Sequence, residues 1–170
     1  SADFAKMERD GTNLSVILHE MGHVLGFTGY TWEERGFLAY NGGTCLTSTV
    51  VRYRGPSART QWHALGGSGD VPVEDNQLEG TACAHWDEDV FGDELMTGYL
   101  SLHTHLSAMT VGALADLGYQ VDYAAADPYS LPPAEPLGPA AVRTPIHEEL
   151  LAPFGTIAAD GTVTPFAPGK

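Results

Sequence analysis

The sequence predicts an α+β fold with two dominant helices, a few short strands and much irregular chain. Residues 13–26 and 108–117 each repeat apolar residues at helical spacing. Residues 47–53 contain enough β-branched side chains for a strand. The chain has 170 residues, of which 43% are hydrophobic, so it is long enough to form one globular unit around a core.

The first helix is expected over residues 13–26. Thr12 and Asn13 are good N-cap residues, because their side-chain oxygens can accept hydrogen bonds from the first backbone N–H groups. Gly26 ends the helix, since glycine readily adopts the left-handed conformation that follows a helix C-terminus. We expect one side of this helix to pack against the core through five apolar residues: Leu14, Ile17, Leu18, Met21 and Leu25.

Shorter elements are expected after the first helix. A strand lies within 47–53, and Pro56-Ser57 begins a short helix that covers 58–65 and stops at a pair of glycines. Residues 71–74 form an extended segment, and its proline favours the edge of a sheet over the centre. Residues 80–99 are expected to be a loop that is dense in acidic and aromatic side chains.

The second dominant helix is predicted over residues 108–117. Ser107 is a suitable N-cap, and Gly118 follows the last periodic residue, where it can end the helix. Four residues of this helix face the core at helical spacing: Met109, Val111, Leu114 and Leu117.

The composition changes towards the C-terminus, because nine of the eleven prolines lie from residue 128 onward. We therefore expect a folded domain at 1–123 and a proline- and alanine-rich tail or linker at 124–170. Only about ten residues precede the first helix, so we expect the chain to be a fragment of a longer protein.

The net charge of −14 argues against a nucleic-acid partner and against docking to anionic lipid, both of which require a basic surface. No apolar run approaches the length of a transmembrane segment.

The acidic clusters at 70–79 and 87–94 lack the alternating oxygen ligands of a calcium loop, and we expect them to be solvated. Cys45 and Cys83 can form one disulfide or remain free thiols.

The first helix carries the motif His19-Glu20-Met21-Gly22-His23. Two histidines four residues apart on a helix project from one face, so both rings can reach one metal ion. The adjacent carboxylate of Glu20 is placed to take a proton from metal-bound water. The same pattern also occurs by chance in helices that bind no metal, and a third ligand is needed to decide between the two interpretations.

A catalytic zinc ion takes three protein ligands and keeps one position for water. In the compact metzincin pattern a third histidine follows the second by six residues, but Gly29 occupies that position here. The remaining candidates are five histidines and one cysteine: His63, His85, His103, His105, His147 and Cys83.

Several of these candidates have simpler interpretations. His63 is expected to be an ordinary surface or core residue, and His103 and His105 to belong to a solvated loop. His147 lacks a second histidine at motif spacing. Cys83 is an alternative ligand, although we favour its pairing with Cys45.

Further motifs follow the metal helix in a definite order: the segment Val71–Asn76, the pair His85-Trp86, the stretch DELMTG at 93–98 and the helix end at 115–119. Together with HEMGHVLGF at 19–27, they make residues 12–123 resemble the leishmanolysin family. Members of this family are metzincin zinc proteases in which a long insertion separates the metal helix from its third histidine.

The resemblance implies that His19, His23 and His85 bind Zn²⁺, that Glu20 is the catalytic carboxylate and that Met96 is the Met-turn residue beneath the metal. The expected fold is a metzincin (zincin) catalytic domain. It would comprise mainly the lower half, with the metal helix, the Met-turn and the C-terminal helix, because the N-terminal sheet of the family is largely missing.

The implied function is a zinc-dependent endopeptidase that hydrolyses protein or peptide substrates, with Glu20 as general base towards a metal-activated water. Tyr99, three residues after Met96, is a candidate for supporting the oxyanion. The resemblance also implies a secreted or cell-surface location. The alternative is a catalytically inactive metal-binding domain with an adhesion or structural role. No feature of the sequence indicates an oligomeric state.

Overall fold

The computed structural model describes residues 7–45, 47–75, 81–101, 103–133, 144–145, 155–158 and 160–165. Helices and short antiparallel strands are mixed in this part of the chain, which agrees with the predicted α+β class. The helices are α2 (Asn13–Val24), α3 (Gly29–Glu34), α4 (Pro56–Ala64), α5 (Glu88–Phe91), α6 (Ala108–Asp116) and the 3₁₀ turn η1 (Tyr123–Ala125). The strands are β1 (Leu38–Tyr40), β2 (Val51–Tyr53), β3 (Val71–Val73), β4 (Tyr99–Leu100), β5 (Thr144–Pro145), β6 (Gly155–Ile157) and β7 (Val163–Pro165).

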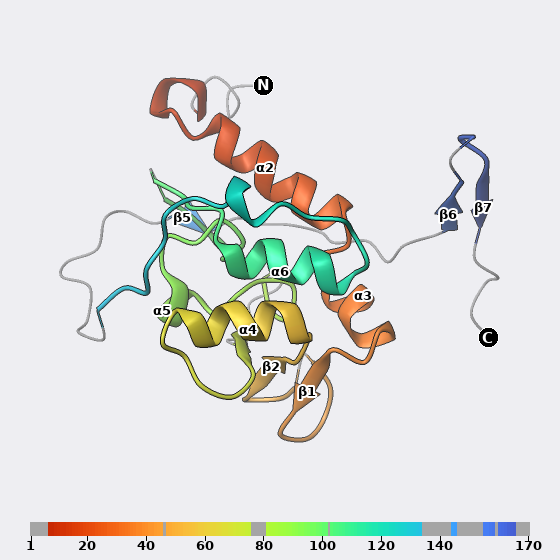
Figure 1. Cartoon of the computed structure of the whole chain (residues 1–170), viewed down its shortest axis with the longest axis horizontal. Coiled ribbons are helices and arrows are strands. Elements are labelled where there is room, and N and C mark those ends of the chain that lie inside the picture. The colour runs from red at the N-terminus through yellow and green to blue at the C-terminus, as the bar shows by residue number, and fades with distance from the viewer. Residues whose placement is uncertain are drawn as a thin grey trace.

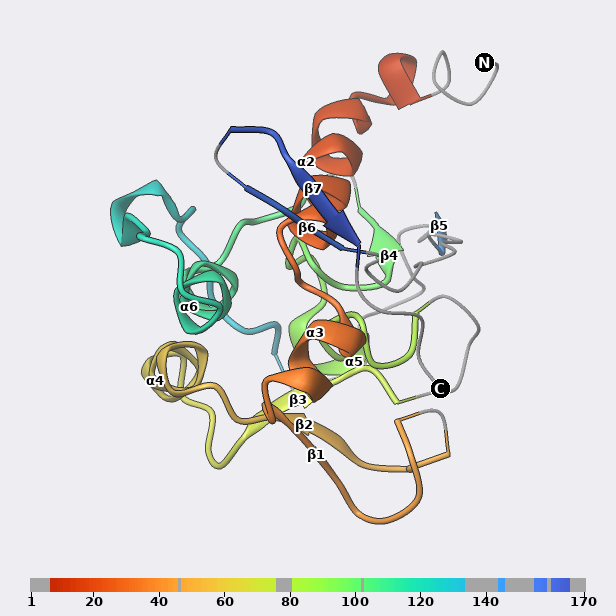
Figure 2. The same ribbon diagram turned by 90° about the vertical axis from the view of Figure 1, so that its right-hand side faces the viewer.

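The helices α4 and α6 lie side by side, and α2 lies on the other side of α6 (Figure 1). The strands β1, β2 and β3 form an antiparallel sheet in that order, with Arg52 of the central strand opposite Pro72. Figure 2 shows α3 between this sheet and α2. The strands β6 and β7 form a hairpin that stands apart from the helices in Figure 1.

The core is centred on an aromatic cluster. The ring of Trp86 stacks on that of Trp32 with centroids 5.4 Å apart, and it meets Phe27 and Tyr53 edge-on at 4.9 and 5.5 Å. All four side chains are fully buried. Because such rings bury large apolar areas, this cluster holds the segments after α2, in β2 and around residue 86 against one another.

Most of the shorter elements lie where the sequence predicts them. The helix that begins at Pro56 is α4, the strand within 47–53 is β2, and the segment with Pro72 is β3, at an edge of the three-stranded sheet. The side chain of Ser107 accepts a hydrogen bond from the N–H of Thr110 and caps α6 as expected.

The prediction of a core-facing apolar side of α2 is wrong. The exposed fractions of the five residues are 63% for Leu14, 47% for Ile17, 41% for Leu18, 51% for Met21 and 38% for Leu25. The helix turns His19 and His23 inward instead, and both are buried. The two faces lie on opposite sides of the helix, so contacts made by the histidines leave the apolar side at the surface.

The start of α2 also differs from the prediction. Thr12 occupies the N-cap position with helical dihedral angles, and its side chain makes no capping hydrogen bond. Residues 7–10 are already helical, and the N–H of Thr12 bonds the carbonyl of Met7. Asn13 contributes locally, since its Oδ1 accepts a hydrogen bond from the N–H of Leu14.

Two short helices lie in stretches for which the sequence predicted only irregular chain. Thr28 caps α3 by accepting from the N–H of Thr31, and Asp87 caps α5 by accepting from the N–H groups of Asp89 and Val90. Each cap residue is of a type that favours helix starts. The helices are shorter than the window over which hydrophobic periodicity is visible.

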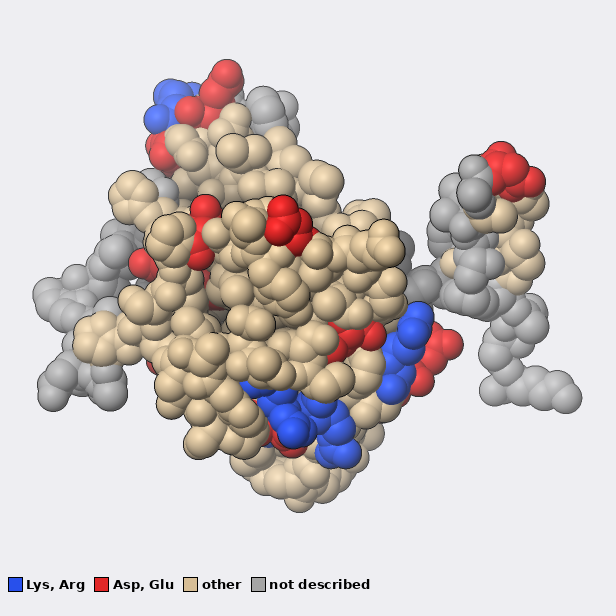
Figure 3. All heavy atoms as spheres, viewed as in Figure 1, with Lys and Arg blue, Asp and Glu red and all other residues tan. Residues whose placement is uncertain are grey.

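The described residues of the acidic clusters 70–79 and 87–94 are only partly solvated, which corrects the expectation that both clusters are solvated. Glu74, Glu88 and Glu94 have exposed fractions of 4%, 8% and 0%. In Figure 3 the acidic side chains on the face shown form small separate groups, and Lys and Arg gather mainly in its lower part. No broad basic area is visible among the described residues on this face.

A disulfide joins Cys45 to Cys83, which are 38 residues apart in the sequence, and this is the pairing that we favoured.

The first residues after 123 pack on the domain. The Oδ2 of Asp127 accepts from the N–H of Leu106, and the hydroxyl of Tyr129 donates to the carbonyl of Phe91. The division of the chain into 1–123 and 124–170 stays a prediction.

Candidate metal centre

The helix α2 presents His19 and His23 from one face, and a well-formed helix end fixes the second of them. The N–H of Phe27 bonds the carbonyl of Gly22, and the N–H of Gly26 bonds the carbonyl of His23. Gly26 has a φ of +102°, as expected for the left-handed residue that ends a helix in this way. This turn brings the carbonyl of Phe27 next to the ring of His23.

His85 comes from a distant segment that is held on both sides. Its carbonyl accepts from the N–H of Glu74, and the next residue, Trp86, donates its N–H to the carbonyl of Met96. The side chain of Trp86 sits in the aromatic cluster. A residue anchored in the core therefore determines where the neighbouring imidazole lies.

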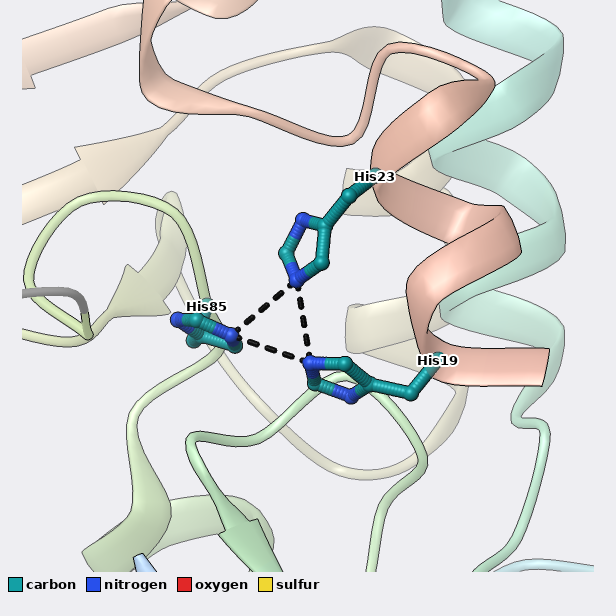
Figure 4. A group of neighbouring side chains, drawn as sticks. All are labelled: His19, His23 and His85. Carbon is teal, nitrogen blue, oxygen red and sulfur yellow. Dashed lines mark hydrogen bonds between the residues drawn. The ribbon is translucent and has the colours of Figure 1, made fainter. Parts of the chain in front are cut away.

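The three imidazoles meet in one place, as Figure 4 shows. The Nε2 atoms of His19 and His23 are 3.0 Å apart, those of His19 and His85 are 3.1 Å apart, and those of His23 and His85 are 3.2 Å apart. The exposed fractions of the three residues are 1%, 7% and 0% for His19, His23 and His85. The site is a nearly equilateral triangle of buried nitrogen atoms.

The second nitrogen of each ring is held by a backbone carbonyl. The Nδ1 atoms of the three histidines lie 2.7 Å from the oxygen of Leu95 (His19), 2.7 Å from that of Phe27 (His23) and 2.8 Å from that of Thr81 (His85). Because a carbonyl oxygen only accepts, each Nδ1 carries a proton, and in the neutral form of each ring the Nε2 lone pair points at the other two rings. Three lone pairs at this separation repel one another, and a cation among them removes the repulsion.

The donor set fits zinc. Two nitrogen ligands of a tetrahedral zinc ion, each at about 2.0–2.1 Å from the metal, are separated by roughly 3.3 Å. The observed spacings of 3.0–3.2 Å are close to that value. A backbone acceptor for the remote N–H of each imidazole is also the usual support for a metal-ligating histidine.

Two glycines allow other parts of the chain to approach the site closely. A Cβ atom on Gly22 would lie 2.7 Å from the sulfur of Met96, so the thioether packs against the helix between His19 and His23. A Cβ atom on Gly29 would lie 2.8 Å from the carbonyl oxygen of Cys83. The loop that leads to His85 thus occupies the space that a side chain at position 29 would need. The compact pattern has its third histidine at this position.

The side chain of Glu20 is exposed, on the metal helix next to His19. Tyr99 is half-buried at the start of β4, where it pairs with Pro145 of β5. The role of Tyr99 as oxyanion support stays a prediction.

The other candidate ligands lie elsewhere in the described part of the chain. His63 is exposed, with its Nε2 2.8 Å from the carbonyl oxygen of Gly69. His103 is exposed and His105 is half-buried, and neither belongs to the three-histidine group. The sulfur of Cys83 is used in the disulfide. His147 lies outside the described residues.

Sequence reasoning did not identify the residues that support the three rings. The acceptors for Nδ1 are backbone carbonyls, for which any residue type would serve. The sequence predicts that Glu94 belongs to a solvated cluster, but its side chain is buried and accepts a hydrogen bond from the N–H of Met96. The apolar neighbours Leu95 and Met96 are the signal that could have indicated its burial.

The described residues thus define a candidate metal centre with three histidine ligands on a mixed helix and sheet scaffold. A model of the leishmanolysin family (peptidase M8) matches residues 2–131. The chain therefore belongs to this metalloprotease family. The resemblance inferred from the motifs is therefore confirmed. No match was found among curated proteins or among solved structures.

Proposed function

We propose that this protein is a zinc-dependent endopeptidase. The observation that carries the proposal is the convergence of three Nε2 atoms within 3.2 Å of one another while each Nδ1 is bonded to a carbonyl. Membership of the leishmanolysin family supports the same activity. In this proposal His19, His23 and His85 hold the ion, and Met96 packs beneath it.

Zinc, when bound, supplies a Lewis acid that acidifies water and polarises the substrate carbonyl. The chain supplies the proton transfers. The carboxylate of Glu20 accepts a proton from the attacking water and then delivers it to the nitrogen of the leaving amine. Its place beside His19 suits this role, because the side chain is accessible to solvent while its helix carries two of the ligands.

The three imidazoles have a separate task, which is to remain neutral and correctly oriented. Each Nδ1–H is bonded to a carbonyl, so each ring is held with Nε2 towards the site.

Peptides are the proposed substrates because the family consists of proteases. We also propose a secreted or cell-surface location, which the Cys45–Cys83 disulfide supports because disulfides persist in oxidising compartments.

The test is the substitution Glu20→Gln, which keeps the size of the side chain and removes the base. We expect full zinc content and a loss of peptide cleavage of at least about a hundredfold, the usual contribution of a general base. Glu34→Gln removes an exposed carboxylate from the neighbouring helix α3 and is the matched control, with wild-type activity expected. Zinc content and chelator-sensitive casein digestion are measured together.

The outcomes separate the proposed enzyme from the alternative. Chelator-sensitive cleavage by Glu20→Gln at the wild-type rate would remove Glu20 from the mechanism. A wild-type chain that binds zinc but cleaves nothing would favour the inactive metal-binding domain instead.

A further inference from the structure

Glu94 is a fully buried acid outside the three-histidine group. Its carboxylate accepts four hydrogen bonds. Oε2 accepts from the N–H of Met96 at 2.6 Å. Oε1 accepts from the hydroxyl and the N–H of Ser107 at 2.6 and 3.2 Å and from the hydroxyl of Thr110 at 2.5 Å. The side chain thereby joins the turn at 94–97 to the first turn of α6.

All four partners of this carboxylate are donors, so both of its oxygens act as acceptors. Burial raises the pKa of Glu94 above its ordinary value, although the hydrogen bonds from Ser107, Thr110 and Met96 lower it in part. An amide of the same size has only one acceptor oxygen. Its NH₂ group would face either the N–H of Met96 or the donors of α6. The site is therefore specific for a carboxylate.

The turn that Glu94 holds meets the candidate metal centre at two points. The carbonyl of Leu95 lies 2.7 Å from the Nδ1 of His19, and the sulfur of Met96 packs against Gly22. Both residues directly follow Glu94 in the chain. A shift of this turn would move the acceptor that orients His19.

A second path leads from Glu94 towards His85. The hydroxyl of Thr110, which donates to Glu94, accepts a hydrogen bond from the indole N–H of Trp86 at 2.8 Å. The backbone N–H of Trp86 donates to the carbonyl of Met96. Because Trp86 directly follows His85, the same buried network reaches the segment that carries the third imidazole.

We propose that Glu94 is a positioning residue for the metal centre. Its carboxylate holds the 94–97 turn so that the carbonyl of Leu95 orients the ring of His19 and Met96 packs beneath the ligands. This inference rests on the proposed function, because it requires that the three histidines bind a metal.

The experiment compares Glu94→Gln with Asp116→Asn in the full chain loaded with Co²⁺. Asp116 is the matched control, because its carboxylate accepts three hydrogen bonds, close to the four of Glu94. Its donors are the N–H groups of Ser57 and Ala58 and the hydroxyl of Tyr53. It lies at the other end of α6. The readouts are the visible absorption bands of cobalt and the rate at which a chelator removes the metal.

We expect Glu94→Gln to change the cobalt bands and to release the metal at least about tenfold faster, as loss of a residue that supports a ligand does. Asp116→Asn should keep the wild-type bands and rate, even where it lowers stability. Wild-type bands and rate in Glu94→Gln would overturn the inference.

A second pair covers the case in which Glu94→Gln does not fold. Thr110→Val removes the hydroxyl that links Trp86 to Glu94, and Thr110→Ser keeps it. Faster metal release from the valine variant alone supports the network, and equal rates for both variants contradict it. A wild-type chain that binds neither Co²⁺ nor Zn²⁺ would overturn the proposed function as well, whereas a normal metal site in Glu94→Gln would overturn only the role of Glu94.

Discussion

The helices α2 and α6 were predicted on the same grounds, yet they use their apolar residues in opposite ways. In α6, Met109 is fully buried and Val111 has an exposed fraction of 5%. In α2, Met21 has an exposed fraction of 51% and Val24 one of 86%. The helix with the metal motif turns its polar face inward.

The difference shows that hydrophobic periodicity predicts a helix more securely than it predicts which face is buried. The orientation of α6 follows from packing, because its inward face lies along α4 and contributes to the core. The orientation of α2 follows from specific polar contacts, in which His19 bonds the carbonyl of Leu95 and both rings meet His85. In α2, two histidines take the inward positions that apolar side chains occupy in α6.

The largest effect expected from this comparison comes from the same substitution in the two helices. Met109→Ala should lower the free energy of unfolding by about 2–5 kcal/mol, because it leaves a cavity in the core. Met21→Ala should change it by about 0.5 kcal/mol or less, because half of that side chain is already in water. Urea unfolding of both variants measures the two values.

Equal losses in these two variants would contradict the orientation of α2 described here. To separate a stability effect from loss of the metal, each variant is unfolded both with zinc and with a chelator. The small effect of Met21→Ala should persist in both conditions.

A smaller effect is expected at α5, whose start is also determined by a polar side chain. Burial, with a contribution from nearby Glu74, raises the pKa of Asp87 to about 6. Because the folded pKa exceeds the unfolded one, near 3.9, the contribution of Asp87 to stability is fully present below about pH 4 and is lost as the pH rises through about 6. Asp87→Asn keeps a good cap residue and removes this cost.

The variant Asp87→Asn should therefore be more stable than the wild type at pH 7.5, by about 1 kcal/mol or less once solvent screening of this partly exposed group is considered. The difference should disappear near pH 4. Urea unfolding at the two pH values checks this, and a variant that is less stable by the same amount at both would show that the carboxylate acts only as a cap.

The parts of the fold that the sequence predicted are those determined by local signals. Pro56 begins α4, Ser107 caps α6, and Gly26 takes the left-handed conformation after α2. The helices α3 and α5 were not predicted, because their cap residues Thr28 and Asp87 stand before stretches too short for a periodic pattern.

The candidate site likewise combines residues that local signals predict with residues that such signals do not predict. The pair His19 and His23 follows from spacing on one helix, and His85 could be selected only through the resemblance of its neighbours to a family. The carbonyl acceptors of the three rings carry no residue signature. The hydrogen-bond partners of Glu94 lie 13 and 16 residues further along the chain, and local composition does not reveal such contacts.

The central claim is that His19, His23 and His85 bind one metal ion together. Its most direct test is the zinc content of purified protein after dialysis, for the wild type, His85→Ala and the control His105→Ala. We predict one zinc ion per chain for the wild type and the control, and loss of the metal from His85→Ala. Retention of one zinc ion per chain by His85→Ala would contradict the claim.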